Sequence, residues 1–159
     1  MSDYPRPIAF LGVGVPGSGK TTYLKLFASE MGPSCHYLCA DDFREQLAGD
    51  AADQSVNAEA WRMVYDAAET WLGKGESVVI DATHAKHWER RAAVQRYRGD
   101  RAATAIAITF EVEIEVALER NKARARTVPE AAIRDMARLL EEHPVTTDEG
   151  FDDIIEVRT

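Results

Sequence analysis

A glycine-rich stretch near the N-terminus carries the clearest chemical signal in the sequence. GVPGSGKT, residues 14–21, fits the pattern G-x-x-x-x-G-K-[ST]. Its glycines let the backbone turn tightly and present successive N–H groups, which suit phosphate oxygens at the start of a helix. Lys20 adds a point charge for the β- and γ-phosphates, and the Thr21 hydroxyl is a magnesium ligand. The stretch predicts a site for a nucleoside triphosphate made by Gly14, Pro16, Gly17, Ser18, Gly19, Lys20, Thr21 and Thr22.

A pair of neighbouring acids follows the second apolar run, in LCADDFREQL, residues 38–47. Two adjacent carboxylates repel each other and are costly near a core, so a function is expected for them. A carboxylate at Asp41, at the end of a strand, can accept the proton of an alcohol and orient its oxygen. Arg44, about one helical turn on, can hold a substrate phosphate by two hydrogen bonds. Asp42 is expected to cap the helix that follows.

A third acid ends a buried run in SVVIDATH, residues 77–84. Ligands collect at the carboxyl ends of strands in open α/β sheets, so Asp81 is predicted to bind the magnesium ion or its waters. The alternative is an ordinary strand-end aspartate that caps the next turn.

The stretch ALERNKARARTVPE, residues 117–130, supplies cations. Arg120 and Arg124 are four residues apart and share a helix face, and Arg126 lies just beyond. A basic element that folds over bound nucleotide would neutralise charge and exclude water, so a lid is predicted over about residues 115–130. The alternative is an exposed basic helix end favoured by the helix dipole.

The elements that must position these residues alternate in type. Apolar, β-branched runs predict five strands, and amphipathic patterns predict helices between them. This order favours βαβ crossovers and a mostly parallel, helix-covered sheet, hence an α/β fold. The aromatic stripe of residues 57–72 is interpreted as core rather than as a base-stacking platform. The predicted strands are 8–15, 36–40, 77–82, 104–112 and 153–157, and the helices are 21–29, 57–72, 89–98, 113–126 and 129–143.

Length and charge limit the function classes. The 159 residues are expected to form one domain, and the net charge of −8 argues against broad coating of duplex DNA. Residues 86–126 nevertheless hold ten of the 19 basic residues against six acids. For 90–101 a phosphate-binding surface and a solvated helix face are equally good interpretations.

Nothing in the sequence suggests a membrane or secreted protein. No apolar run approaches the roughly 18 residues that span a bilayer, and MSDYPRP does not resemble a secretory signal. Cys35 and Cys39 are expected to be reduced thiols rather than zinc ligands, because no second ligand pair follows at zinc-site spacing. The expected location is the cytoplasm, with no membrane partner.

Four motifs in this order resemble the 5′-kinase domain of phage polynucleotide kinase and its P-loop relatives. They are GVPGSGKTT, CADDFR, VVIDATHAKHWERR and ERNKARARTVPEAAI, within residues 8–143. The resemblance implies a kinase-like three-layer P-loop NTPase sandwich with a helical arginine lid, here standing alone as one domain over residues 1–159. Family members commonly have Arg before the aspartate pair and Asn after the Thr of the third motif, where this chain has Ala40 and His84.

The resemblance also implies roles for single residues. Lys20 and Thr21 correspond to the residues for ATP phosphates and magnesium, Asp41 to the general base, and Arg44 to the acceptor-phosphate residue. The remaining positions are the lid residues Arg120 and Arg124, with Arg126 able to take one role, and the segment beside the active site, Asp81, Thr83 and His84.

The predicted function is phosphorylation of a nucleic-acid hydroxyl by ATP or GTP with Mg²⁺, at the 5′-OH end of DNA or RNA. No signature of a switch NTPase is present. One alternative is a phage-type DNA kinase that phosphorylates a hydroxymethyl group of a modified pyrimidine, which would require the base to leave the stack. Others are a small-metabolite or antibiotic kinase, and a nucleotide-binding module without catalysis.

Overall fold

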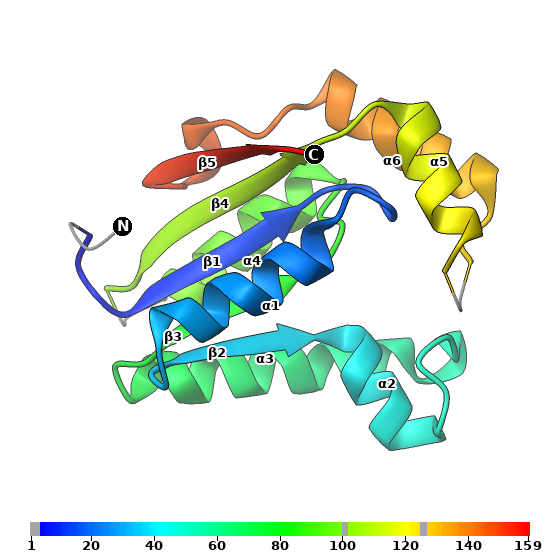
Figure 1. Cartoon of the computed structure of the whole chain (residues 1–159). Helices are drawn as coiled ribbons and strands as arrows, with labels where there is room; N and C mark the ends of the chain where they lie inside the picture. Colours follow the sequence, from blue (N-terminus) through cyan, green and yellow to red (C-terminus); the bar gives the residue numbers. More distant parts are fainter. Residues whose placement is uncertain (1–3, 100–101, 125–126) are drawn as a thin grey trace.

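The computed structural model describes residues 4–99, 102–124 and 127–159 (Figure 1). Its five strands are all parallel and lie in the order β2-β3-β1-β4-β5. The α/β prediction is confirmed, because each parallel neighbour is reached by a crossover that contains a helix. The strands are β1 Ile8–Val13, β2 Cys35–Cys39, β3 Ser77–Asp81, β4 Thr104–Glu111 and β5 Asp153–Arg158.

Helices cover both faces of the sheet and one end of it (Figure 1). Side chains alternate along β1, so Phe10 packs with Leu24 on one face while Leu11 packs with Val64 on the other. The described helices are α1 Lys20–Met31, α2 Ala40–Ala48, α3 Asn57–Gly73, α4 His87–Arg98, α5 Ile114–Lys122 and α6 Glu130–Glu142, with 3₁₀ turns η1 Gln54–Val56 and η2 Thr147–Glu149.

The central strand β1 has all six residues buried. Burying one large aliphatic or aromatic side chain contributes roughly 1.5–3 kcal/mol, so this strand anchors the sheet. A separate small cluster, in which Val15 meets Ala117, Leu118 and Ile133, attaches α5 and α6 to the loop after β1. The carboxyl ends of the strands and the α5–α6 pair therefore face each other.

Two local predictions need correction. Strand β2 passes directly into α2 at Ala40, and the N-cap of α2 is Cys39. Asp42 therefore lies inside the first helical turn and does not cap the helix. The helix predicted over 113–126 ends at Lys122, and Arg126 lies outside the described residues.

Most of the described arginines within residues 90–101 form ion pairs with acids of the same chain. Arg90 is fully buried and binds both carboxylate oxygens of Glu149, at 2.8 and 2.5 Å. Arg96 pairs with Glu69, and Arg98 pairs with Asp152. This favours a structural interpretation of these residues over a phosphate-binding surface. Among the described residues, no helix is both long and apolar enough to cross a bilayer.

Candidate active site

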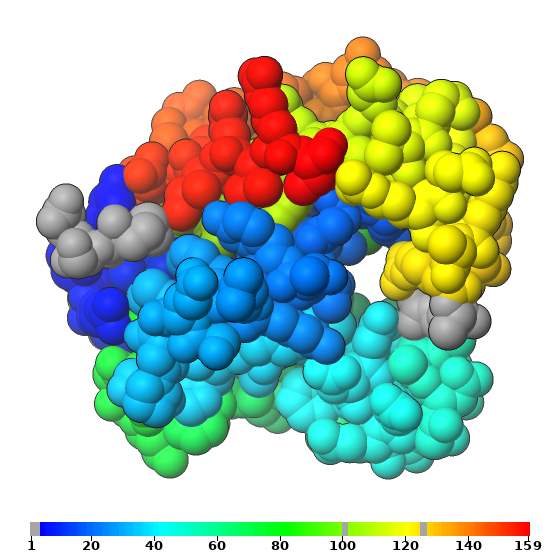
Figure 2. Space-filling view, viewed as in Figure 1, coloured from blue at the N-terminus to red at the C-terminus, as the bar shows by residue number. Residues whose placement is uncertain are grey.

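The surface is hollowed at the carboxyl end of the sheet, between α1, α2 and the yellow end of α5 (Figure 2). One cavity here, which we call the P-loop hollow, has a volume of about 360 Å³. It opens beside the start of α1, where a phosphate-binding loop is expected. Its lining residues are Gly17, Gly19, Lys20, Thr21, Thr22, Lys25, Tyr37, Cys39, Asp41, Asp42, Arg120 and Arg124.

The loop between β1 and α1 has the backbone that its glycines predict. Gly17 and Gly19 have φ of +85° and +84°, in the left-handed region that favours glycine. A Cβ at Gly17 would lie 2.2 Å from the carbonyl oxygen of Ala117, so α5 touches the loop backbone there. Gly14 donates its N–H to the carbonyl of Thr83 at 3.1 Å, which ties the loop to the segment after β3. The loop is thus in contact with α5 on one side and hydrogen-bonded to the segment after β3 on the other.

Asp81 accepts two hydroxyl hydrogen bonds on a single oxygen. Thr21 Oγ1 donates to Asp81 Oδ2 at 2.7 Å, and Tyr37 Oη donates to the same atom at 2.5 Å. Burial, and then the neighbouring Asp81 carboxylate, raise the pKa of Tyr37 far above its usual value, so Tyr37 remains a donor. The Thr21 and Asp81 oxygens are hard ligands that fit Mg²⁺. No group of three or more His, Cys, Asp or Glu side chains gathers for a metal within the described ranges, so such an ion would also need phosphate oxygens.

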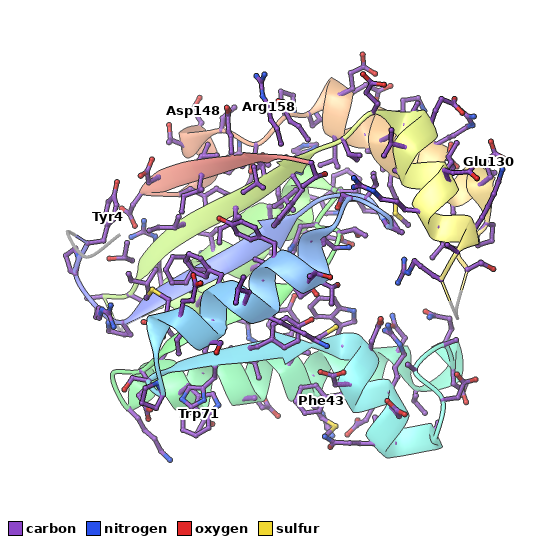
Figure 3. The ribbon with its side chains drawn as sticks, viewed as in Figure 1. Tyr4, Phe43, Trp71, Glu130, Asp148 and Arg158 are labelled. Atoms are coloured by element: carbon purple, nitrogen blue, oxygen red, sulfur yellow. The ribbon has the colours of Figure 1, made fainter. Side chains whose placement is uncertain are left out.

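A second cavity, which we call the α3 hollow, has a volume of about 730 Å³ and adjoins the first. Five residues line both cavities: Lys20, Thr21, Cys39, Asp41 and Arg124. Further lining residues, grouped by position, are Arg44 on α2, Ala52, Gln54, Asn57 and Trp61 around α3, Asp81 at the end of β3, Ala82, Thr83, Ala85, Lys86 and Glu89 between β3 and the first turn of α4, and Thr127, Val128, Pro129, Met136 and Leu139 near α6. Figure 3 places Phe43, on α2, and Glu130, at the start of α6, on opposite sides of the hollowed region.

Asp41 and Arg44 form an ion pair on α2, with the Asp41 side chain 37% exposed. Arg44 is only 6% exposed, and donates to the carbonyl of Ala51 at 2.7 Å and to Asn57 Oδ1 at 2.6 Å. The guanidinium therefore joins α2, the following loop and α3 while it holds the carboxylate. The sequence predicted that Arg44 holds a substrate phosphate. In the structure its guanidinium also makes three contacts within the protein.

The two described arginines of the predicted lid take different positions. Arg120 Nη1 lies 3.4 Å from the Gly17 carbonyl and 3.3 Å from Thr159 Oγ1, beside the P-loop hollow. Arg124 is exposed and borders both hollows. Buried Asn121 binds both backbone groups of Val128, at 2.7 and 3.0 Å, and so brings the chain back after α5. Nothing in the residue pattern around Asn121 had indicated this role.

The side chains of Thr83 and His84 lie in different environments. Thr83 lines the α3 hollow, whereas His84 is 7% exposed and donates from Nδ1 to the Gly12 carbonyl at 2.7 Å. Burial lowers the pKa of His84, which favours the neutral ring. The φ of His84 is +47°, in a region where Asn and His are enriched. This conformation is one that His, like the Asn expected here from the resemblance, can adopt.

Several lining residues were missed by the sequence analysis. Tyr37 and Cys39 are two apart on β2, so the period of two along a strand places both on one side. Burial, followed by the charge of Asp81, raises the pKa of the Cys39 thiol. Trp61 packs against the core as predicted and also lines the α3 hollow. Nothing in the sequence around Asn57 or Lys86 indicated that these residues line the α3 hollow.

Comparison with known proteins supports a kinase-like P-loop fold. No curated protein matches the chain. A chain of the Pnkp1/Rnl/Hen1 RNA repair complex is 25% identical over 94% of this chain, with a TM-score of 0.76. The present chain spans about half, 47%, of that chain.

Two further structures share the fold. A candidate kinase from Chloroflexus aurantiacus is 22% identical, with a TM-score of 0.73 and coverage of 98% of this chain and 86% of that one. Kti12 of Chaetomium thermophilum, solved with ADP-AlF3, is 16% identical, with a TM-score of 0.70 and coverage of 94% and 88%. The fold implies nucleotide binding. Since the family model described as AAA domain matches residues 10–143, the chain belongs to the AAA_33 family of P-loop proteins.

Proposed function

We propose that the protein transfers the γ-phosphoryl group of ATP or GTP to the 5′-OH end of DNA or RNA. The observation that carries the proposal is the position of Asp41, where the P-loop hollow meets the α3 hollow. A base for phosphoryl transfer must touch the acceptor oxygen while that oxygen faces the γ-phosphorus. A carboxylate shared by the two cavities meets this requirement.

The triphosphate would occupy the P-loop hollow, with the loop N–H groups and Lys20 on its phosphates. Mg²⁺ held by Thr21 and Asp81 would neutralise charge on the phosphate oxygens. The acceptor oxygen attacks the γ-phosphorus, its proton passes to Asp41, and the bond from phosphorus to the β,γ-bridging oxygen breaks to release the nucleoside diphosphate.

The remaining charged groups would orient this reaction. Arg44 fixes the Asp41 carboxylate from the side of α3. Arg120 and Arg124 would close on the phosphates as a lid over about residues 115–130, which concentrates positive charge where negative charge develops.

The nucleic-acid acceptor is supported by size and by resemblance. A volume of about 730 Å³ suits one nucleotide-sized group. The matched chain of the Pnkp1/Rnl/Hen1 RNA repair complex is 25% identical over nearly the whole of this chain. The proposal extends that context to this protein.

A small-metabolite acceptor is the second candidate, and a charge pattern favours it. Residues 41–59, which supply part of one wall of the α3 hollow, contain six acids and a single arginine, of which Asp41 and Arg44 line the hollow itself. Such a wall repels a polyanion and is neutral toward an uncharged alcohol.

The deciding experiment offers γ-labelled ATP and Mg²⁺ together with 5′-OH DNA and RNA oligonucleotides, their 5′-phosphorylated counterparts, and uncharged polyols. We expect label on 5′-OH oligonucleotides alone, and none with Asp41→Asn, which should still bind ATP. Labelling of polyols but not of oligonucleotides would select the second candidate. Loss of ATP binding in Asp41→Asn would remove the argument for a base.

A further inference from the structure

An exposed tryptophan, Trp88, lies beside the α3 hollow at the start of α4, where its ring centre is 5.9 Å from the Nζ of Lys86. Lys86 and Glu89 line that hollow, whereas Trp88, between them in the chain, does not line it itself. Trp88 is 53% exposed, one of the largest exposed apolar side chains in the described part of the protein. No lining residue of the α3 hollow other than Trp61 is aromatic.

Contacts within the protein support the start of α4, where Lys86 and Trp88 lie. The His87 ring lies 4.1 Å from that of His143, at the end of α6, with the two rings tilted by 33°, and it contacts the Trp88 ring edge-on at 5.2 Å. The Lys86 Nζ lies 5.9 Å from the centre of the Trp88 ring and 3.7 Å from Glu89. An indole and an ammonium group are thus presented together on a supported surface.

The charge around the α3 hollow differs between its two sides. On one side, residues 41–59 carry six acids and one arginine, of which Asp41 and Arg44 line the hollow itself. The side at the start of α4 carries Lys86 and, one turn further, exposed Arg91, which donates to the backbone carbonyl of Asp148. Glu89 is the one acid between them in the chain. A strand of phosphates that leaves the hollow is therefore attracted to the start of α4 and repelled by α2.

We propose that Trp88 and Lys86 form an outer subsite for the second nucleotide of a single-stranded acceptor. The base of that nucleotide stacks on the indole, and its phosphate contacts the Lys86 ammonium. Single-stranded nucleic acids are bound through such pairs of stacking surfaces and cations. This inference rests on the proposed function, because it assumes a nucleic-acid acceptor in the α3 hollow.

The first test compares two acceptors, a nucleoside 3′-monophosphate and a pentanucleotide with a 5′-OH end. The measured quantity is the ratio of their kcat/KM values. Trp88→Ala should lower the preference for the pentanucleotide roughly tenfold, as expected for the loss of one base–aromatic contact. Trp88→Phe should retain most of it. Leu26→Ala, an equally exposed apolar site on α1 that lines neither hollow, should leave the ratio unchanged.

The second test observes binding directly. In Trp61→Phe/Trp71→Phe protein, Trp88 is the remaining tryptophan, and a 5′-OH pentanucleotide should quench its fluorescence. In the matched Trp61→Phe/Trp88→Phe protein, Trp71 near the far end of α3 should not respond (Figure 3). Quenching in both proteins, or in neither while a labelled pentanucleotide binds, contradicts the subsite.

The outcomes separate this inference from the proposed function. If the wild-type protein phosphorylates oligonucleotides and Trp88→Ala keeps the wild-type ratio within twofold, only the subsite is wrong. If the wild-type protein phosphorylates neither acceptor, the proposed function fails and the subsite fails with it.

Discussion

Arg44 donates a hydrogen bond to Asp41 from the adjacent turn of α2, at the boundary between the two hollows. The same guanidinium reaches Ala51 and Asn57. The orientation of the one carboxylate shared by both hollows thus depends on how α2 packs against the start of α3.

Changing Arg44 should therefore impair catalysis more than nucleotide binding. Arg44→Lys keeps the charge but cannot reach three acceptors in a planar fork, so we expect kcat to fall about 10–100-fold. Loss of buried hydrogen bonds should also cost about 1–3 kcal/mol of unfolding free energy. Steady-state kinetics, ATP titration calorimetry and urea unfolding would check this. Unchanged kcat alongside reduced stability would leave Arg44 with a structural role alone.

The Asp81 oxygen that binds Thr21 and Tyr37 leads to a prediction about metal binding. Tyr37→Phe removes one of the two hydroxyl donors and should free the carboxylate to rotate. We expect ATP affinity in the presence of Mg²⁺ to fall about tenfold, as is typical when a group that orients a metal ligand is lost. Affinity without Mg²⁺ should not change. Calorimetric titration under both conditions is the measurement, with Tyr65→Phe, which lines neither hollow, as the control.

Equal losses with and without Mg²⁺ would contradict the role of Tyr37 in orienting Asp81. They would show instead that Tyr37 supports the nucleotide site as a whole, because its ring also lines the P-loop hollow.

Gly17 has two constraints, a positive φ and the close approach of α5. Gly49 has a similar φ of +71° but open space around its missing Cβ, so Gly49→Ala is a matched control for backbone strain. That control should cost about 1–2 kcal/mol of unfolding free energy. Gly17→Ala should lose more stability and most ATP affinity, because the methyl group would collide with the Ala117 carbonyl. Equal effects of the two substitutions on Tm and on ATP binding would contradict this contact.

Buried His84 predicts acid sensitivity. Its pKa in the folded protein is lowered from 6.5 because burial disfavours the imidazolium ion. Below about pH 6.5 the unfolded chain binds a proton that the folded protein does not, so stability is present above this pH and is lost as pH falls. Urea unfolding at pH 7.5 and 5.5 should show the loss, and His84→Asn should reduce it.

His87 will contribute to the same slope, since burial and the nearby His143 lower its pKa. The His84→Asn variant should therefore flatten the dependence without abolishing it. A wild-type protein equally stable at both pH values would contradict the effect of burial on both rings.

Much of the fold follows from local sequence. The β-branched runs and amphipathic patterns predicted five strands in a parallel sheet, because burial on both faces requires nearly continuous apolar residues. The glycines of residues 14–21 predicted a tightly turned loop, because the conformation of such a loop is set by residue types next to one another. The Asp42 cap failed because β2 enters α2 without an intervening residue.

The sequence by itself determined the parallel sheet, the glycine loop and the placement of Asp81 at the end of β3, whereas Asp41, expected at a strand end, lies in the first turn of α2. Tertiary structure alone decided that Arg90 binds Glu149, 59 positions away, and that Tyr37 and Thr21 meet on one oxygen of Asp81. Neighbours along the chain fix backbone conformation, but hydrogen-bond and ion partners are chosen by packing. Packing brings together residues whose separation in sequence carries no signal.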